Sequence, residues 1–66
     1  MYQQALSFLN EYVEISTYLS QYKLYGKIIS VTPIEIALLR DQREKYSHDD
    51  YTLYIPLNSV ISIRKL

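Results

Sequence analysis

The stretch that decides the fold is Lys23-Leu24-Tyr25-Gly26-Lys27-Ile28-Ile29-Ser30-Val31, a β-branched and aromatic run typical of a strand. Gly26 is the only glycine among the 66 residues, and it lies inside this run. Glycine weakens a strand interior, because it loses more backbone entropy on folding and offers no side chain for packing. Its position therefore predicts a sharp bend or a close backbone approach. Strongly bent strands let a short antiparallel sheet curl into a small barrel.

Two periodicities organise the rest of the chain. Apolar residues at three- and four-residue spacings predict an amphipathic helix over residues 2–11, and the period then drops to two. The expected strands cover residues 12–19, 23–31, 34–40, 51–55 and 60–65, with Thr32-Pro33 as a break, 41–50 as a polar hairpin connection and 57–59 as a tight turn. The sequence thus predicts one α+β domain over residues 1–66, a short N-terminal helix followed by a strongly bent five-stranded antiparallel sheet.

The chain is too short to rely on its core alone. A domain of this size usually needs disulfides, a metal or oligomerisation to offset the entropy of the unfolded chain. Cysteine is absent, and His48 is the only histidine, so neither disulfides nor a metal site is expected. Oligomerisation is the remaining means of stabilisation, and we expect a homo-oligomer without cofactors.

Charge and hydropathy limit the partners. Seven Lys and Arg residues balance seven Asp and Glu residues, which argues against strong non-specific binding to polyanions. The apolar stretches are too short to span a bilayer, and residues 1–4 lack the basic region of a signal peptide, so we expect a cytoplasmic protein without membrane contact.

The same residues give no indication of an enzyme. The serines have no His and Asp partners at nucleophile spacing, and a single glycine cannot form a phosphate-binding loop. His48, beside Asp49 and Asp50, is expected in a solvated loop rather than in a catalytic or metal site.

The order of these elements resembles the Sm-like family, in particular its bacterial branch, the Hfq-type RNA chaperones. Gly26 is followed two, five, eight and ten residues later by Ile28, Val31, Ile34 and Ile36, the apolar spacing of the first Sm motif. The resemblance covers almost the whole chain and implies a small barrel. It also implies that strands four and five pair with neighbouring subunits to close a ring, which in the Hfq branch is usually a hexamer.

Several positions depart from the family pattern. Thr32 stands where the family usually has an aspartate, and Asn10-Glu11 replaces its basic cluster after the helix. At the second Sm motif, tyrosine-lysine-histidine in the family, this chain has Tyr54-Ile55-Pro56. Ile55 and Pro56 cannot donate the charge-assisted hydrogen bonds by which that motif grips uridine-rich RNA.

On the face of the ring opposite to the second Sm motif, this chain keeps more of the family's sequence pattern. Tyr18, Lys23 and Leu24 match family positions that stack and seat purine-rich RNA, and an aromatic platform beside a lysine suits single-stranded RNA. Tyr18 also has a plainer interpretation as an outward residue of a strand. The eight tyrosines of the chain suit subunit interfaces at least as well as base stacking.

Two functions follow as expectations. The first is an Hfq-like ring that binds single-stranded, purine-rich RNA through Tyr18, Lys23 and Leu24, with Tyr54 as a remnant of a weakened uridine site. The second is an Sm-like barrel that acts as a structural or protein-interaction module without RNA. The segment 54–63 favours the second, because it is similar to the endings of small barrel proteins of spore-forming bacilli and of PRC-barrel domains. We favour the first function, because the match to the RNA-binding branch covers more of the chain.

Overall fold

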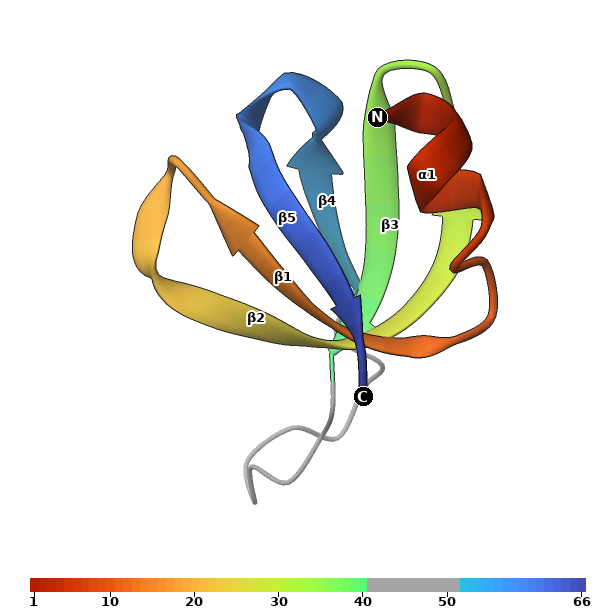
Figure 1. The fold of residues 1–66 in the computed structure, drawn as a ribbon, viewed down its shortest axis with the longest axis horizontal. Helices are drawn as coiled ribbons and strands as arrows, with labels where there is room; N and C mark the ends of the chain where they lie inside the picture. Colours follow the sequence, from red (N-terminus) through yellow and green to blue (C-terminus); the bar gives the residue numbers. More distant parts are fainter. Residues whose placement is uncertain (41–51) are drawn as a thin grey trace.

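The computed structural model describes residues 1–40 and 52–66 (Figure 1). The elements are α1 (Tyr2–Leu6), β1 (Tyr12–Thr17), β2 (Ser20–Val31), β3 (Glu35–Arg40), β4 (Thr52–Pro56), the 3-10 turn η1 (Leu57–Ser59) and β5 (Val60–Lys65). The expected hairpin connection 41–50, with His48, and the expected strand residue Tyr51 lie outside the described residues.

The five strands form one antiparallel sheet in the order β4-β3-β2-β1-β5. This confirms a short N-terminal helix followed by a five-stranded antiparallel sheet. The sheet curls strongly, and η1 connects its two end strands (Figure 1). Within the described residues no ladder joins β4 to β5, so the sheet of the single chain is open rather than a closed barrel.

The core lies inside the curl of the sheet. Five aliphatic side chains have no exposed surface, and all of them come from the three central strands: Val13, Ile15, Ile28, Ile36 and Leu38. Ala5 of α1 is equally buried, so the helix packs against this cluster through the side that carries Ala5. The alternation of apolar residues selects which face of each strand points inward.

At Gly26 the backbone of β3 leaves no room for a side chain on β2. It pairs with Val13 of β1 and with Arg40 of β3, so β2 is bonded on both sides at this point. A Cβ atom on Gly26 would lie 2.4 Å from the carbonyl oxygen of Leu39 and 2.9 Å from the Cα atom of Arg40. The φ angle of Gly26 is not positive. Close backbone approach, not a glycine-only conformation, therefore explains this residue.

The helix is shorter than the periodicity predicts. It ends at Leu6 rather than near residue 11, and residues 7–10 form turns. The backbone N–H of Asn10 donates to the carbonyl of Ile28 at 2.7 Å, and the N–H of Ile28 donates to the carbonyl of Glu11 at 3.1 Å. These bonds to β2 compete with further helical bonds, and Asn10 adopts a left-handed backbone conformation with a φ of 68°, which a right-handed helix cannot include.

The first strand is also shorter than expected, and β2 is longer. β1 ends at Thr17 instead of residue 19, because Tyr18 and Leu19 form a tight turn into β2, which begins at Ser20. The N–H of Leu19 donates to the Thr17 hydroxyl at 3.2 Å, and the N–H of Tyr18 donates to the carbonyl of Ser59 at 2.8 Å. Tyr18 is thus a turn residue and not a strand residue.

Across residues 1–40 and 52–66, none of the helices reaches the length and apolar character that a bilayer crossing requires.

Candidate functional site

The four residues expected to bind RNA are divided among different parts of the fold. Tyr18 lies in the β1–β2 turn with 76% of its surface exposed, and Tyr54 lies on the end strand β4 with 63% exposed. Lys23 and Leu24 are neighbours on β2. Since β3 separates β4 from β2 in the sheet, Tyr54 does not belong to the same surface strip as Tyr18 and Lys23.

Lys23 and Leu24 point to opposite faces of β2. Leu24 pairs with Ile15 and packs partly against the core, whereas the Lys23 side chain reaches toward β1 on the outer face of the sheet. Strand alternation accounts for this division. A ligand on the outer face therefore meets Lys23 without Leu24.

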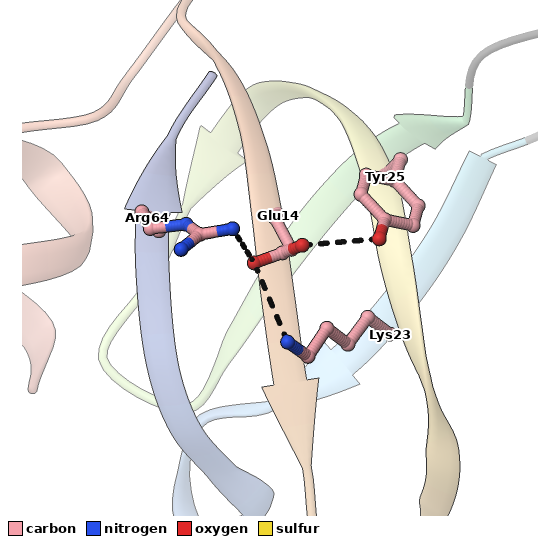
Figure 2. Close-up of polar contacts among 4 residues, drawn as sticks. All are labelled: Glu14, Lys23, Tyr25 and Arg64. Carbon is pink, nitrogen blue, oxygen red and sulfur yellow. Dashed lines mark hydrogen bonds and ion pairs between the residues drawn. The ribbon is translucent and has the colours of Figure 1, made fainter.

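The outer face holds a polar cluster around Glu14, which we call the Glu14 cluster (Glu14, Lys23, Tyr25 and Arg64; Figure 2). Arg64 Nη2 lies 2.9 Å from Glu14 Oε2, and Lys23 Nζ lies 3.8 Å from the same oxygen. The Tyr25 hydroxyl donates a hydrogen bond to the other oxygen, Oε1, at 3.0 Å. The carboxylate of Glu14 thus connects β2, β1 and β5.

The register of the sheet brings these residues together. Glu14 of β1 stands opposite Tyr25 of β2 on one side and opposite Arg64 of β5 on the other. Directly opposed side chains in antiparallel strands are close enough to interact. The Glu14 side chain is only 9% exposed, while those of Arg64 and Lys23 are 71% and 53% exposed.

The cluster changes the acidity of Tyr25. Its hydrogen bond to the Glu14 carboxylate raises the pKa of the phenol above its ordinary value of 10.0, and partial burial and the negative charge of Glu14 act in the same direction. The positive charge of Arg64 opposes this shift in the pKa.

Sequence reasoning missed Glu14 because its place in the alternation made it an outward, polar strand residue. Strand β1 lies between β2 and β5, so side chains of both neighbours cover Glu14. The sequence shows one carboxylate, Glu14, on one strand and Lys23, Tyr25 and Arg64 on two other strands. Only the register of the sheet shows that these side chains lie together.

The second-motif positions of β4 divide between core and surface. Ile55 is 2% exposed and belongs to the core, while Tyr54 and Pro56 are exposed on the outer side. The position that carries a lysine in the resembled family is therefore filled here by a buried aliphatic side chain.

Thr32, which stands where the resembled family has an aspartate, organises the β2–β3 turn. Its hydroxyl accepts hydrogen bonds from the N–H groups of Ile34 at 3.3 Å and Glu35 at 3.1 Å. A hydroxyl oxygen at this position does what a carboxylate oxygen would do for the same donors.

Positive charge near these sites is largely neutralised. Three cations of residues 1–40 and 52–66 form ion pairs with glutamates: Lys23 and Arg64 with Glu14, and Lys65 with Glu11 at 3.5 Å. Such pairing leaves little free charge for a phosphate backbone.

No protein family, curated protein or solved structure that was compared with this chain matches it.

Proposed function

We propose that this chain is an Sm-like module that assembles with copies of itself and acts as a structural or protein-interaction element. In this proposal β4 of one copy pairs with β5 of the next and closes a ring, which completes the barrel that the single chain leaves open. A hexamer is the ring size expected from the resemblance to the Hfq branch.

The observation that carries the proposal is that, among residues 1–40 and 52–66, each of the two end strands has one edge without a partner strand. An unpaired edge presents a row of N–H and C=O groups, which natural proteins cover or blunt with charge. β4 reads Thr52-Leu53-Tyr54-Ile55-Pro56 and has no charged side chain. Tyr54 on β4 and Ile61 on β5 are large apolar residues with 63% and 51% of their surface exposed. Pairing of the two edges between copies would cover both strands.

The electrostatics favour an interaction module over an RNA-binding ring. Glu14 holds Lys23, a buried Ile55 and a proline replace the polar pair of the second motif, and the chain has no net charge. RNA binding draws much of its free energy from phosphate contacts made by free cations.

Light scattering after size exclusion tests assembly. The wild-type chain is expected to elute as a closed oligomer of defined mass. Tyr54→Lys and Ile61→Lys should each dissociate it, because a lysine on an edge strand opposes pairing. Ile34→Lys is the matched control, since Ile34 is 74% exposed but lies in the β2–β3 turn. A monomeric wild type at every concentration, or dissociation by Ile34→Lys alone, would contradict the proposal.

The β1–β2 turn and the first residues of β2 favour a second candidate function, the binding of single-stranded RNA. Tyr18 and Tyr22 are 76% and 72% exposed, and base stacking on such side chains is worth about 1–3 kcal/mol per base. Labelled A-rich and U-rich oligonucleotides titrated over a salt series test it. This candidate expects A-rich binding that weakens with salt and is lost in Tyr18→Ala but retained in Tyr12→Ala. Absence of binding at low salt would leave the interaction module alone.

A further inference from the structure

Three donors from two strands converge on one carboxylate in the Glu14 cluster. Arg64 and Lys23 approach Glu14 Oε2 at 2.9 and 3.8 Å, and the Tyr25 hydroxyl reaches Oε1 at 3.0 Å (Figure 2). Two cations and a neutral donor around one two-oxygen anion form the arrangement by which proteins bind oxyanions. Arginine in particular presents a planar set of N–H groups that matches carboxylates and phosphates.

The Glu14 carboxylate and the cations around it differ in their exposure to solvent. The Glu14 side chain is 9% exposed, whereas the side chains of Arg64 and Lys23 are more than half exposed. The donors can therefore be approached from solvent, while the group that occupies them belongs to the chain itself.

We propose that Lys23, Tyr25 and Arg64 form an oxyanion-binding site that Glu14 fills from within, as an autoinhibitory contact. An external phosphate or carboxylate group must displace Glu14 from these donors before it can bind. Because Glu14 occupies both Lys23 and Arg64, the outer face of the sheet does not bind phosphate groups while this contact is in place. This proposal does not rest on the assembly of copies.

Backbone pairing fixes the strands that carry the donors, so we expect Lys23, Tyr25 and Arg64 to stay around position 14 when Glu14 is replaced. Tyr25 and Arg64 stand opposite position 14 on either side of β1, and these ladders continue above and below it. Removal of the carboxylate should leave the three donors around a vacant position rather than disperse them.

Glu14→Gln and Glu14→Ala test the proposal against Glu11→Gln and Glu11→Ala. Both pairs of variants change the net charge equally, but the Glu11 carboxylate pairs with Lys65, at 3.5 Å, and its side chain is 44% exposed. Inorganic phosphate and acetate are titrated into each protein at constant ionic strength, and binding is followed by calorimetry and by thermal unfolding. The two probes show which oxyanion the site accepts.

The expected result is phosphate or acetate binding at least about ten-fold tighter in the Glu14 variants than in the wild type and the Glu11 variants. Thermal midpoints of the Glu14 variants should rise with the bound anion, because a ligand of the folded state stabilises it by mass action. Adding Arg64→Met to Glu14→Gln should abolish the gain.

Equal responses of the Glu14 and Glu11 variants would overturn the proposal, since net charge alone would then explain them. A gain that survives Arg64→Met would overturn it as well. If Glu14→Ala does not fold, the isosteric Glu14→Gln decides the question. Failure of both to fold at any phosphate concentration would mean that the donors do not persist without Glu14, which also contradicts the proposal.

Discussion

At the scale of single residues, Gly26 and Tyr25 are neighbours with opposite roles. Gly26 faces the core side, where the Leu39 carbonyl and the Arg40 Cα leave no room for a side chain. Tyr25 points to the outer face, where its hydroxyl donates to Glu14. Because side chains alternate along a strand, Gly26 lies on the core side of β2 and Tyr25 lies on the outer side, in the Glu14 cluster.

Substitution of Gly26 should strongly destabilise the protein. A Cβ atom would lie 2.4 Å from a backbone oxygen, which cannot move away as a flexible side chain could. Gly26→Ala should lower the free energy of unfolding by about 1–3 kcal/mol, and Gly26→Val by more. Urea unfolding measures both, with Ser30→Val on the exposed side of β2 as the control, expected to change stability little. Native stability in Gly26→Val would contradict the close approach.

Tyr25 should make stability sensitive to alkaline pH. Its pKa in the folded state is raised above 10.0 by its hydrogen bond to Glu14, so the folded chain retains the phenolic proton at a pH where the unfolded chain loses it. This contribution is fully present below pH 10 and is lost as the pH rises through the folded-state pKa. Urea midpoints between pH 8 and 11 should therefore fall more in wild type than in Tyr25→Phe. Parallel curves would refute this role of the phenol.

At the scale of elements, local hydrogen bonds set where helix and strands end. The helix stops early because Asn10 and Glu11 bond to Ile28 of β2, and β1 stops at Thr17 because Tyr18 bonds to Ser59. Propensity alone predicts longer elements, and these tertiary bonds override it.

The β2–β3 turn depends on the hydroxyl of Thr32. Thr32→Ala removes the acceptor of the N–H groups of Ile34 and Glu35 and should cost about 1 kcal/mol of unfolding free energy. Thr32→Asp should retain most of the stability, because its carboxylate can accept from the same donors. Thermal and urea unfolding compare the two variants. Equal loss in both would show that the turn depends on the methyl group of Thr32 or on the hydrogen bond that its hydroxyl donates to the carbonyl of Glu35 at 3.3 Å, and not on the hydrogen bonds that it accepts from the two N–H groups.

At the scale of the whole molecule, the open sheet and the exposed apolar side chains are the dominant features. The end strands β4 and β5 are joined by η1, each has one edge without a partner among the described residues, and large apolar residues such as Tyr54 and Ile61 are exposed on them. A domain of 66 residues gains little stability from its own core. The proposed contacts between copies would bury these side chains.

If the chain assembles as proposed, its thermal stability should depend on protein concentration. Dissociation precedes or accompanies unfolding in an assembled ring, so the midpoint should rise with concentration over two or more decades. Tyr54→Lys, which opposes edge pairing, should unfold at a lower midpoint that no longer varies. Calorimetry across a dilution series measures this. A concentration-independent midpoint in wild type would contradict obligate assembly, and a dependence that Tyr54→Lys leaves intact would place the interface elsewhere.

The sequence by itself determined the class of the fold, the number of strands and the special position of Gly26. Period-two alternation and turn residues act locally, so they can be recognised without knowing which strands are neighbours. Only the tertiary structure decided that Tyr18 lies in a turn and that Glu14 is covered by its neighbouring strands. The Glu14 cluster joins residues 14, 23, 25 and 64, and its existence depends on strand order and register. Those are non-local properties, because they arise from which strands pair and not from any one segment of the chain.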